Sequence, residues 1–160
     1  MQTGHAFLAG VAGGGAMNAA MALARWMGLE VHLEQTLGTM VLDPGAAAWF
    51  VGLVLHLGIS GLIALLYAWG FEHVARRAGV AVGLLFAVPH LLLAGVFMGA
   101  VLPAVHPLVP EVLPAPGSFM LSLGALGAAA FVLLHLLYGA VVGGIYGSVL
   151  QPGSASRATA

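Results

Sequence analysis

Four apolar runs divide the chain, and each is long enough to cross a bilayer as a helix. They cover residues 6–27, 46–71, 80–102 and 122–148. A transmembrane α-helix needs about 20 predominantly apolar residues, and open strands or irregular backbone cannot face lipid. The pattern therefore predicts an all-α fold, a bundle of four transmembrane helices. We expect one membrane domain over residues 1–150 and a flexible cytoplasmic tail at 151–160.

The connections between the runs differ in character. Residues 29–45 are polar and long for a loop between packed helices, so we expect part of them to form a short interfacial helix. Residues 103–116 hold five prolines and are expected to run extended rather than helical. The fourth run is longer than one span requires, so it either tilts or begins with an interfacial turn.

The first run allows two interpretations. Its small residues, such as those at 13–16, suit a transmembrane helix that packs closely against a neighbour. The alternative is a cleaved signal peptide, because residues 22–24 (Ala-Leu-Ala) resemble a cleavage site. Residues 1–5 contain no Lys or Arg, which a signal peptide should have there. We therefore expect a retained helix.

Composition supports a membrane protein and removes several other classes. The chain is 61% hydrophobic and 6% charged, with a mean hydropathy of +1.08, whereas soluble domains are about 25% charged. A net charge of −1 offers no basic surface for nucleic acid. Without Cys there are no disulfides, thiolate metal sites or iron–sulfur clusters. A bound metal would need His, Met, Tyr or carboxylate ligands.

The charged residues predict an orientation in the membrane. Arg76, Arg77 and Arg157 fall on one side of the four-span layout, which the positive-inside rule assigns to the cytoplasm. Four of the five acidic residues fall on the other side; they are Glu30, Glu34, Asp43 and Glu111. Arg25 is the exception, near the outer end of the first run. We expect a multi-pass membrane protein with both termini in the cytoplasm.

Three histidines lie inside the apolar runs, and they are the candidate site residues. His56 and His90 are each ten residues from the start of their runs, roughly 15 Å deep at 1.5 Å per residue. His135 lies at the same depth if its helix begins near Ala125. Strongly polar side chains are costly at the bilayer centre, where they usually face inward and serve function. We therefore predict that His56, His90 and His135 line one midplane site.

The surroundings of two of these histidines repeat. Residues 53–57 (Leu-Val-Leu-His-Leu) resemble residues 132–136 (Val-Leu-Leu-His-Leu), and a tyrosine follows each histidine by eleven positions. This similarity predicts two tandem helix-hairpin repeats related by a pseudo-two-fold axis along the membrane normal. The second and fourth helices would then face each other, with His56 and His135 aimed at a shared space.

Such a site has three interpretations. Two imidazoles on facing helices are what axial ligation of a b-type haem requires, and nearby glycines would leave room for it or only let backbones approach. These glycines are Gly58, Gly61, Gly139, Gly143 and Gly144. A transition metal such as Cu or Fe is the second option, with His90 as third ligand and Met17, Met21 or Met98 as soft partners for Cu(I).

In the third interpretation the histidines only bond neighbouring helices, and the methionines only fill space. The remaining histidines are expected to be solvated in loops or at chain ends; they are His5, His32, His73 and His106. Tyr67 and Tyr146 are expected at the cytoplasmic membrane interface, where aromatic residues gather.

These motifs carry a family resemblance. Residues 37–40 (Leu-Gly-Thr-Met), Trp49, His56, residues 65–67 (Leu-Leu-Tyr) and residues 135–147 resemble small four-helix bacterial membrane proteins of a family of unknown function. The resemblance implies the four-span layout and a histidine in the second, third and fourth helices. It implies no activity.

The sequence does not predict an enzyme. It contains no phosphate loop with a Lys, no HExxH and no serine in a nucleophile elbow. We expect an accessory subunit of a larger respiratory or photosynthetic assembly, in contact with lipid and with other membrane subunits or a second copy. The alternatives are a self-contained b-type haem and quinone electron carrier, or a small-solute or metal transporter.

Overall fold

The protein is an all-α bundle of four long helices, as the sequence predicts. The computed structural model describes residues 1–109 and 112–150; Glu111 and the predicted tail with Arg157 lie outside the described residues. The long helices are α1 (Thr3–Trp26), α3 (Ala46–Gly70), α4 (Val80–Val96) and α6 (Gly124–Leu150). With the turns that continue them, four helical segments are long and apolar enough to cross a membrane.

Shorter elements extend or join these helices. The π-helical turn η1 (Phe71–Ala75) continues α3, and a second one, η2 (Phe97–Val101), continues α4 into α5 (Leu102–Val105). The first connection contains a short helix, α2 (Leu33–Gly38), as expected, and the 3₁₀ turn η3 (Ser118–Leu123) precedes α6. The prediction that residues 103–116 are not helical is wrong at their start, because Pro103 lies in the first turn of α5, where proline is tolerated.

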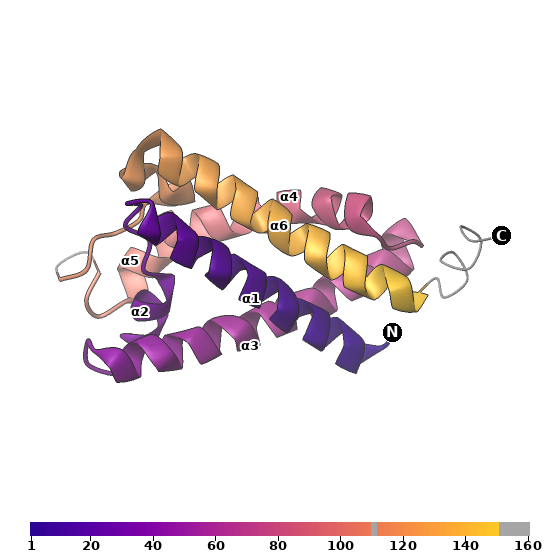
Figure 1. Cartoon of the computed structure of the whole chain (residues 1–160), viewed down its shortest axis with the longest axis horizontal. Coiled ribbons are helices and arrows are strands. Elements are labelled where there is room, and N and C mark those ends of the chain that lie inside the picture. Colours follow the sequence, from indigo (N-terminus) through magenta and orange to yellow (C-terminus); the bar gives the residue numbers. More distant parts are fainter. Residues whose placement is uncertain (110–111, 151–160) are drawn as a thin grey trace.

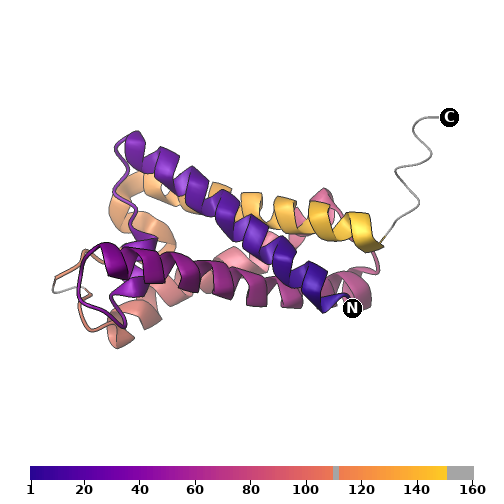
Figure 2. The same ribbon diagram turned by 60° about the horizontal axis from the view of Figure 1, so that its bottom comes forward.

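α1 lies between α3 and α6, and α4 packs along the other side of α6 (Figures 1 and 2). α3 and α6 therefore meet at only a few points, although the repeat hypothesis has them facing each other. The two tandem repeats stay a prediction. One end of the bundle carries α2, α5 and η3, and the other carries the N-terminus and the α3–α4 turn (Figure 1).

Glycines bring the helix pairs into backbone contact. Gly10 of α1 lies directly against Ser60 and Gly61 of α3, and Gly83 of α4 lies against the backbone of Gly139 and Gly143. Small residues permit this approach, which drives helix association where lipid offers no hydrophobic force. At these positions the glycines admit a neighbouring helix and leave no room for a flat macrocycle.

The end of the bundle that carries α2, α5 and η3, called the loop end from here on, is held by an ion pair. The Arg25 guanidinium donates to both carboxylate oxygens of Glu34 at 3.0 and 3.3 Å and to the carbonyl of Val31 at 2.8 Å. Glu34 is only 1% exposed. Removing one partner of such a buried pair typically costs about 3–5 kcal/mol, and the partial exposure of Arg25 places this pair toward the lower end. This pairing accounts for the position of Arg25, at the opposite end of the bundle from Arg76 and Arg77 (Figure 1).

His106 joins the second half of the chain to α2. The prediction that it is solvated is wrong, since it is 5% exposed. Its Nε2–H donates to the carbonyl of Thr36 at 2.7 Å, and its Nδ1 accepts the backbone N–H of Leu108 at 3.0 Å. The imidazole thus holds the proline-rich segment against α2 at the loop end.

The opposite end is joined through Glu72. Its carboxylate binds the N-terminal amino group of Met1 at 3.0 Å and accepts the hydroxyl hydrogen of Tyr146 at 2.5 Å. Tyr146 was expected among interfacial aromatics, but it is 1% exposed and also accepts the backbone N–H of Gln2 at 3.0 Å. α1 and α6 are therefore fixed together at the end that carries Arg76 and Arg77.

The glycine contact between α4 and α6 makes a direct prediction. Gly83→Ala places a methyl group on the Gly139 carbonyl oxygen and should destabilise the bundle by about 1–3 kcal/mol, as overpacking does. Gly58→Ala is the matched control, because nothing lies within 4 Å of its added methyl group and alanine favours a helix. Unfolding in detergent measures both, and equal stability of the two variants would contradict the packing account.

Candidate ligand cavity and histidine cluster

The three intramembrane histidines all lie inside the bundle. His56 and His135 are buried, and His90 is half-buried. The rings of His90 and His135 are in edge-to-face contact, with centroids 4.9 Å apart. His56 forms its side-chain hydrogen bond with Asn18 of α1. The structure thus brings His90 and His135 together, while His56 is tied to a different helix.

Two tyrosines complete the cluster around His90. The Tyr67 hydroxyl lies 3.1 Å from His90 Nδ1, and the Tyr138 ring packs edge-to-face on both Tyr67 and His90. Tyr67 is 4% exposed, so the prediction that it sits at the membrane interface is wrong. The sequence could not assign Tyr67 to the interior, because α3 is apolar on nearly every side and no pattern marks its inward face.

A hydrogen bond fixes the tautomer of His135. Its Nδ1 lies 2.8 Å from the carbonyl oxygen of Phe131, which can only accept, so Nδ1 is the donor and Nε2 keeps its lone pair. His56 Nδ1 lies 3.1 Å from the side-chain amide of Asn18. The Ser60 hydroxyl donates to the His56 carbonyl at 2.7 Å, and Tyr138 donates to the Ser60 carbonyl.

A cavity of about 260 Å³ opens beside this cluster. Its lining runs from α2 at one end of the bundle to His135 of α6, and includes residues of α1, η2 and η3. An engineered apolar cavity of about 150 Å³ is enough to bind benzene, so this space suits a small guest. Largely apolar cavities with a few polar groups are the usual form of ligand sites.

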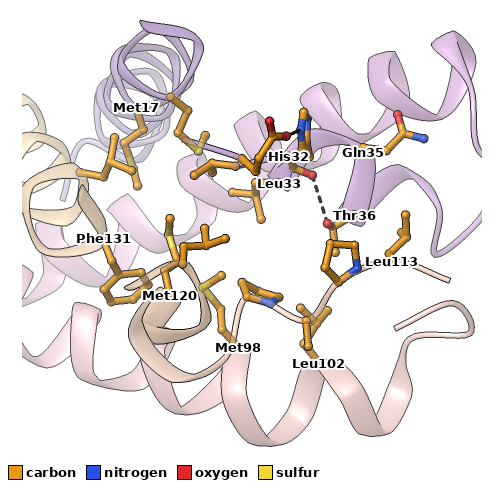
Figure 3. A pocket seen from close by; sticks show the side chains of 18 of the residues that line it. Met17, His32, Leu33, Gln35, Thr36, Met98, Leu102, Leu113, Met120 and Phe131 are labelled. Atoms are coloured by element: carbon orange, nitrogen blue, oxygen red, sulfur yellow. Dashed lines mark hydrogen bonds and ion pairs between the residues drawn. The ribbon is translucent and has the colours of Figure 1, made fainter. Parts of the chain in front are cut away.

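Methionines are concentrated in the wall of this cavity. Four of the seven in the chain line it; they are Met17, Met21, Met98 and Met120. Met17, Met98 and Met120 come from three different segments and point into the same space (Figure 3). The sequence singled out the first three as soft ligands but not Met120, whose segment carries no recognisable pattern.

Met120 is held in place by an unusual backbone. Phe119 and Met120 have positive φ angles of 55° and 58°, which cost non-glycine residues about 1–3 kcal/mol each. The turn is kept in this form by the contacts of Ser118 and Phe119 with Gly99 and Gly95. As a result the Met120 side chain is buried at 3% exposure in the cavity wall.

The mouth of the cavity is polar. Glu30 and His32 form a pair at 2.9 Å there, and Gln35 and Thr36 of α2 lie beside them (Figure 3). Glu30 is the one acidic residue among the described residues that line the cavity, and His135 is the titratable group at its depth. The lining therefore changes from polar at the loop end to thioether and imidazole inside.

Metal sites built only from His, Cys, Asp or Glu side chains are not favoured by the structure. Within residues 1–109 and 112–150, no three His, Cys, Asp or Glu side chains are grouped so that they could hold a metal ion. The three-histidine metal site and the haem between His56 and His135 stay predictions. Three of the five glycines named for the haem hypothesis, Gly61, Gly139 and Gly143, are covered by neighbouring residues, whereas Gly58 and Gly144 are not.

No family model matches the sequence, and neither does any curated protein or any solved structure. The candidate site therefore stands on its own geometry.

The bond between Tyr67 and His90 makes the second prediction. A double-mutant cycle with Tyr67→Phe and His90→Leu should give a coupling free energy of about 0.5–2 kcal/mol, the range of hydrogen bonds between membrane helices. The control cycle pairs Tyr67→Phe with His73→Leu, since His73 stacks on Trp69 instead and should show no coupling. Equal coupling in the two cycles, measured by unfolding in detergent, would rule out the bond.

Proposed function

We propose that this protein is an integral membrane accessory protein that takes a small guest into the methionine-lined cavity beside His135 and serves a larger membrane assembly. One observation carries the proposal: the cavity connects a polar mouth at the loop end with a buried imidazole inside the bundle. A void this large costs packing energy, about 24 cal/mol per Å³ in a soluble core, and a bound guest offsets that cost.

The chemistry of His135 favours an electron-pair acceptor as the guest. Its Nδ1–H is committed to the Phe131 carbonyl, so Nε2 offers a lone pair and no proton. A metal ion or a hydroxyl group satisfies a lone pair, whereas the carbonyl of an oxidised quinone does not. Binding of an organic guest with a hydroxyl group, such as a quinol, is the second candidate function, supported by the apolar wall.

The larger assembly is proposed to be respiratory or photosynthetic, with other membrane subunits or a second copy as partners. Large apolar side chains cover the outside of the bundle, among them Leu62, Leu66, Leu85 and Leu93. Lipid or neighbouring subunits can cover such a surface. Copurification of a defined partner in mild detergent tests this part, and a solitary monomer would contradict it.

The guest makes the third prediction. Protein isolated in mild detergent should carry mass beyond the polypeptide in native mass spectrometry, with a Soret band if the guest is haem. Ala115→Phe, which places a ring into the cavity wall, should remove this mass. Ala104→Phe is the matched control, because Ala104 is exposed on neighbouring α5 and does not line the cavity. A bare polypeptide in all three samples would overturn the proposal.

We propose that the protein lies in a bacterial inner membrane with the cavity mouth outside and both termini in the cytoplasm. Arg76 and Arg77 lie at the end of the bundle where Glu72 binds the amino group of Met1. Asp43 lies in the connection at the opposite end (Figure 1). The positive-inside rule assigns the first end to the cytoplasm.

Single cysteines give the fourth prediction, because the natural chain has none. Both Asp43 and Arg76 are exposed, so cysteines there are open to reagents. Cysteine at position 43 should react with an impermeant thiol reagent added outside, and cysteine at position 76 only after the membrane is opened. Reaction of both from the same side would refute the orientation.

A further inference from the structure

We propose that the cavity is a binding site for Cu(I), with a low-coordinate shell drawn from the thioethers of Met17, Met21, Met98 and Met120 and the imidazole of His135. This inference rests on the proposed function and names its guest. It draws on the composition of the cavity wall, the tautomer of His135 and the charge of the site.

The ligand atoms match a soft ion. Thioethers and imidazole bind Cu(I) well, whereas Mg²⁺ and Ca²⁺ require oxygen ligands. Zn²⁺ sites are built from thiolates, imidazoles and carboxylates, and this chain has no Cys. At the depth of the cavity the ligand set is thioether-rich with a single histidine.

The charge of the site favours a monovalent ion. Glu30 lies at the mouth and is paired with His32, while the buried Glu34 is bound by Arg25. The thioethers and the imidazole are neutral, so a bound ion keeps its full charge inside the bundle. Burying a charge costs more as the charge rises, which selects Cu(I) over any divalent ion of similar size.

The hydrogen bond of His135 orients its ring in the way usual for a metal-binding histidine. Metal-bound histidines nearly always donate their other ring N–H to a carbonyl or carboxylate, which fixes the tautomer and orients the ring. The 2.8 Å contact from His135 Nδ1 to the Phe131 carbonyl is such a bond. The His90 ring packs edge-to-face against His135, with centroids 4.9 Å apart, and restricts its movement.

The methionines are also placed more specifically than core filler requires. They come from α1, η2 and η3, and the turn that carries Met120 holds two non-glycine residues at positive φ. Filler methionine adapts to gaps left by its neighbours. Here the backbone itself is strained where it delivers a thioether to the cavity.

The test is competition for Cu(I) in detergent, under anaerobic conditions with ascorbate, against the coloured chelator bicinchoninate. Wild-type protein should withdraw one Cu(I) per chain, and Ag(I), a soft monovalent ion, should compete for it. Zn²⁺ should not compete. The double variant Met17→Leu, Met120→Leu conserves side-chain volume and should bind Cu(I) at least about tenfold more weakly, the scale on which loss of metal-site partners acts.

The control is Met27→Leu, Met40→Leu, which removes two exposed methionines outside the cavity and should bind as wild type does. Circular dichroism of each variant shows that it is folded. Equal Cu(I) affinity of the two double variants would overturn the proposal. So would a wild-type protein that ignores Cu(I) but keeps an organic guest lost in Ala115→Phe, a result that leaves the proposed function standing. Absence of any guest would instead end both.

Discussion

Every polar group inside this bundle has to find its partner within the protein, because the surrounding hydrocarbon offers none. The histidines show how this constraint is met. His135 uses the carbonyl one turn before it, His56 uses Asn18 of α1, and His90 uses Tyr67 of α3. Each bond occupies Nδ1. The second ring nitrogen of His135, a residue that lines the cavity, is thereby left free to bind a guest.

Close packing decides where that cavity lies. Glycines draw α1 onto α3 and α4 onto α6, which leaves little space between these pairs. Toward the loop end the helices are separated by α2, held by Arg25 and Glu34, and by the strained turn η3. The same elements that keep the helices apart supply the methionines and the polar mouth. Among the described residues, Asn18 Nδ2 is the one fully buried side-chain nitrogen or oxygen atom without a hydrogen-bond partner.

The sequence predicts the helices well and their rotation poorly. The long apolar runs predict the four spans, and the length of the first polar connection predicts the short helix within it. The helices are apolar on nearly every side, so no amphipathic pattern shows which face points inward. For this reason the sequence predicts Tyr67 at the interface and does not identify it as the partner of His90.

Contacts between distant segments were equally hidden. The pairing of Arg25 with Glu34 depends on how α2 folds back over α3, and the burial of His106 depends on the same helix. Met120 reaches the cavity through a left-handed backbone that no propensity of Phe or Met predicts. These features come from tertiary packing, and the cavity exists only through them.

The most direct measurement of the central claim is X-ray absorption at the copper edge of wild-type protein loaded with one Cu(I). The account predicts a low-coordinate Cu(I) with a shell dominated by sulfur and one nitrogen ligand from imidazole. A shell of nitrogen and oxygen alone would contradict it, because the methionines would then be packing residues and the copper would sit elsewhere on the chain.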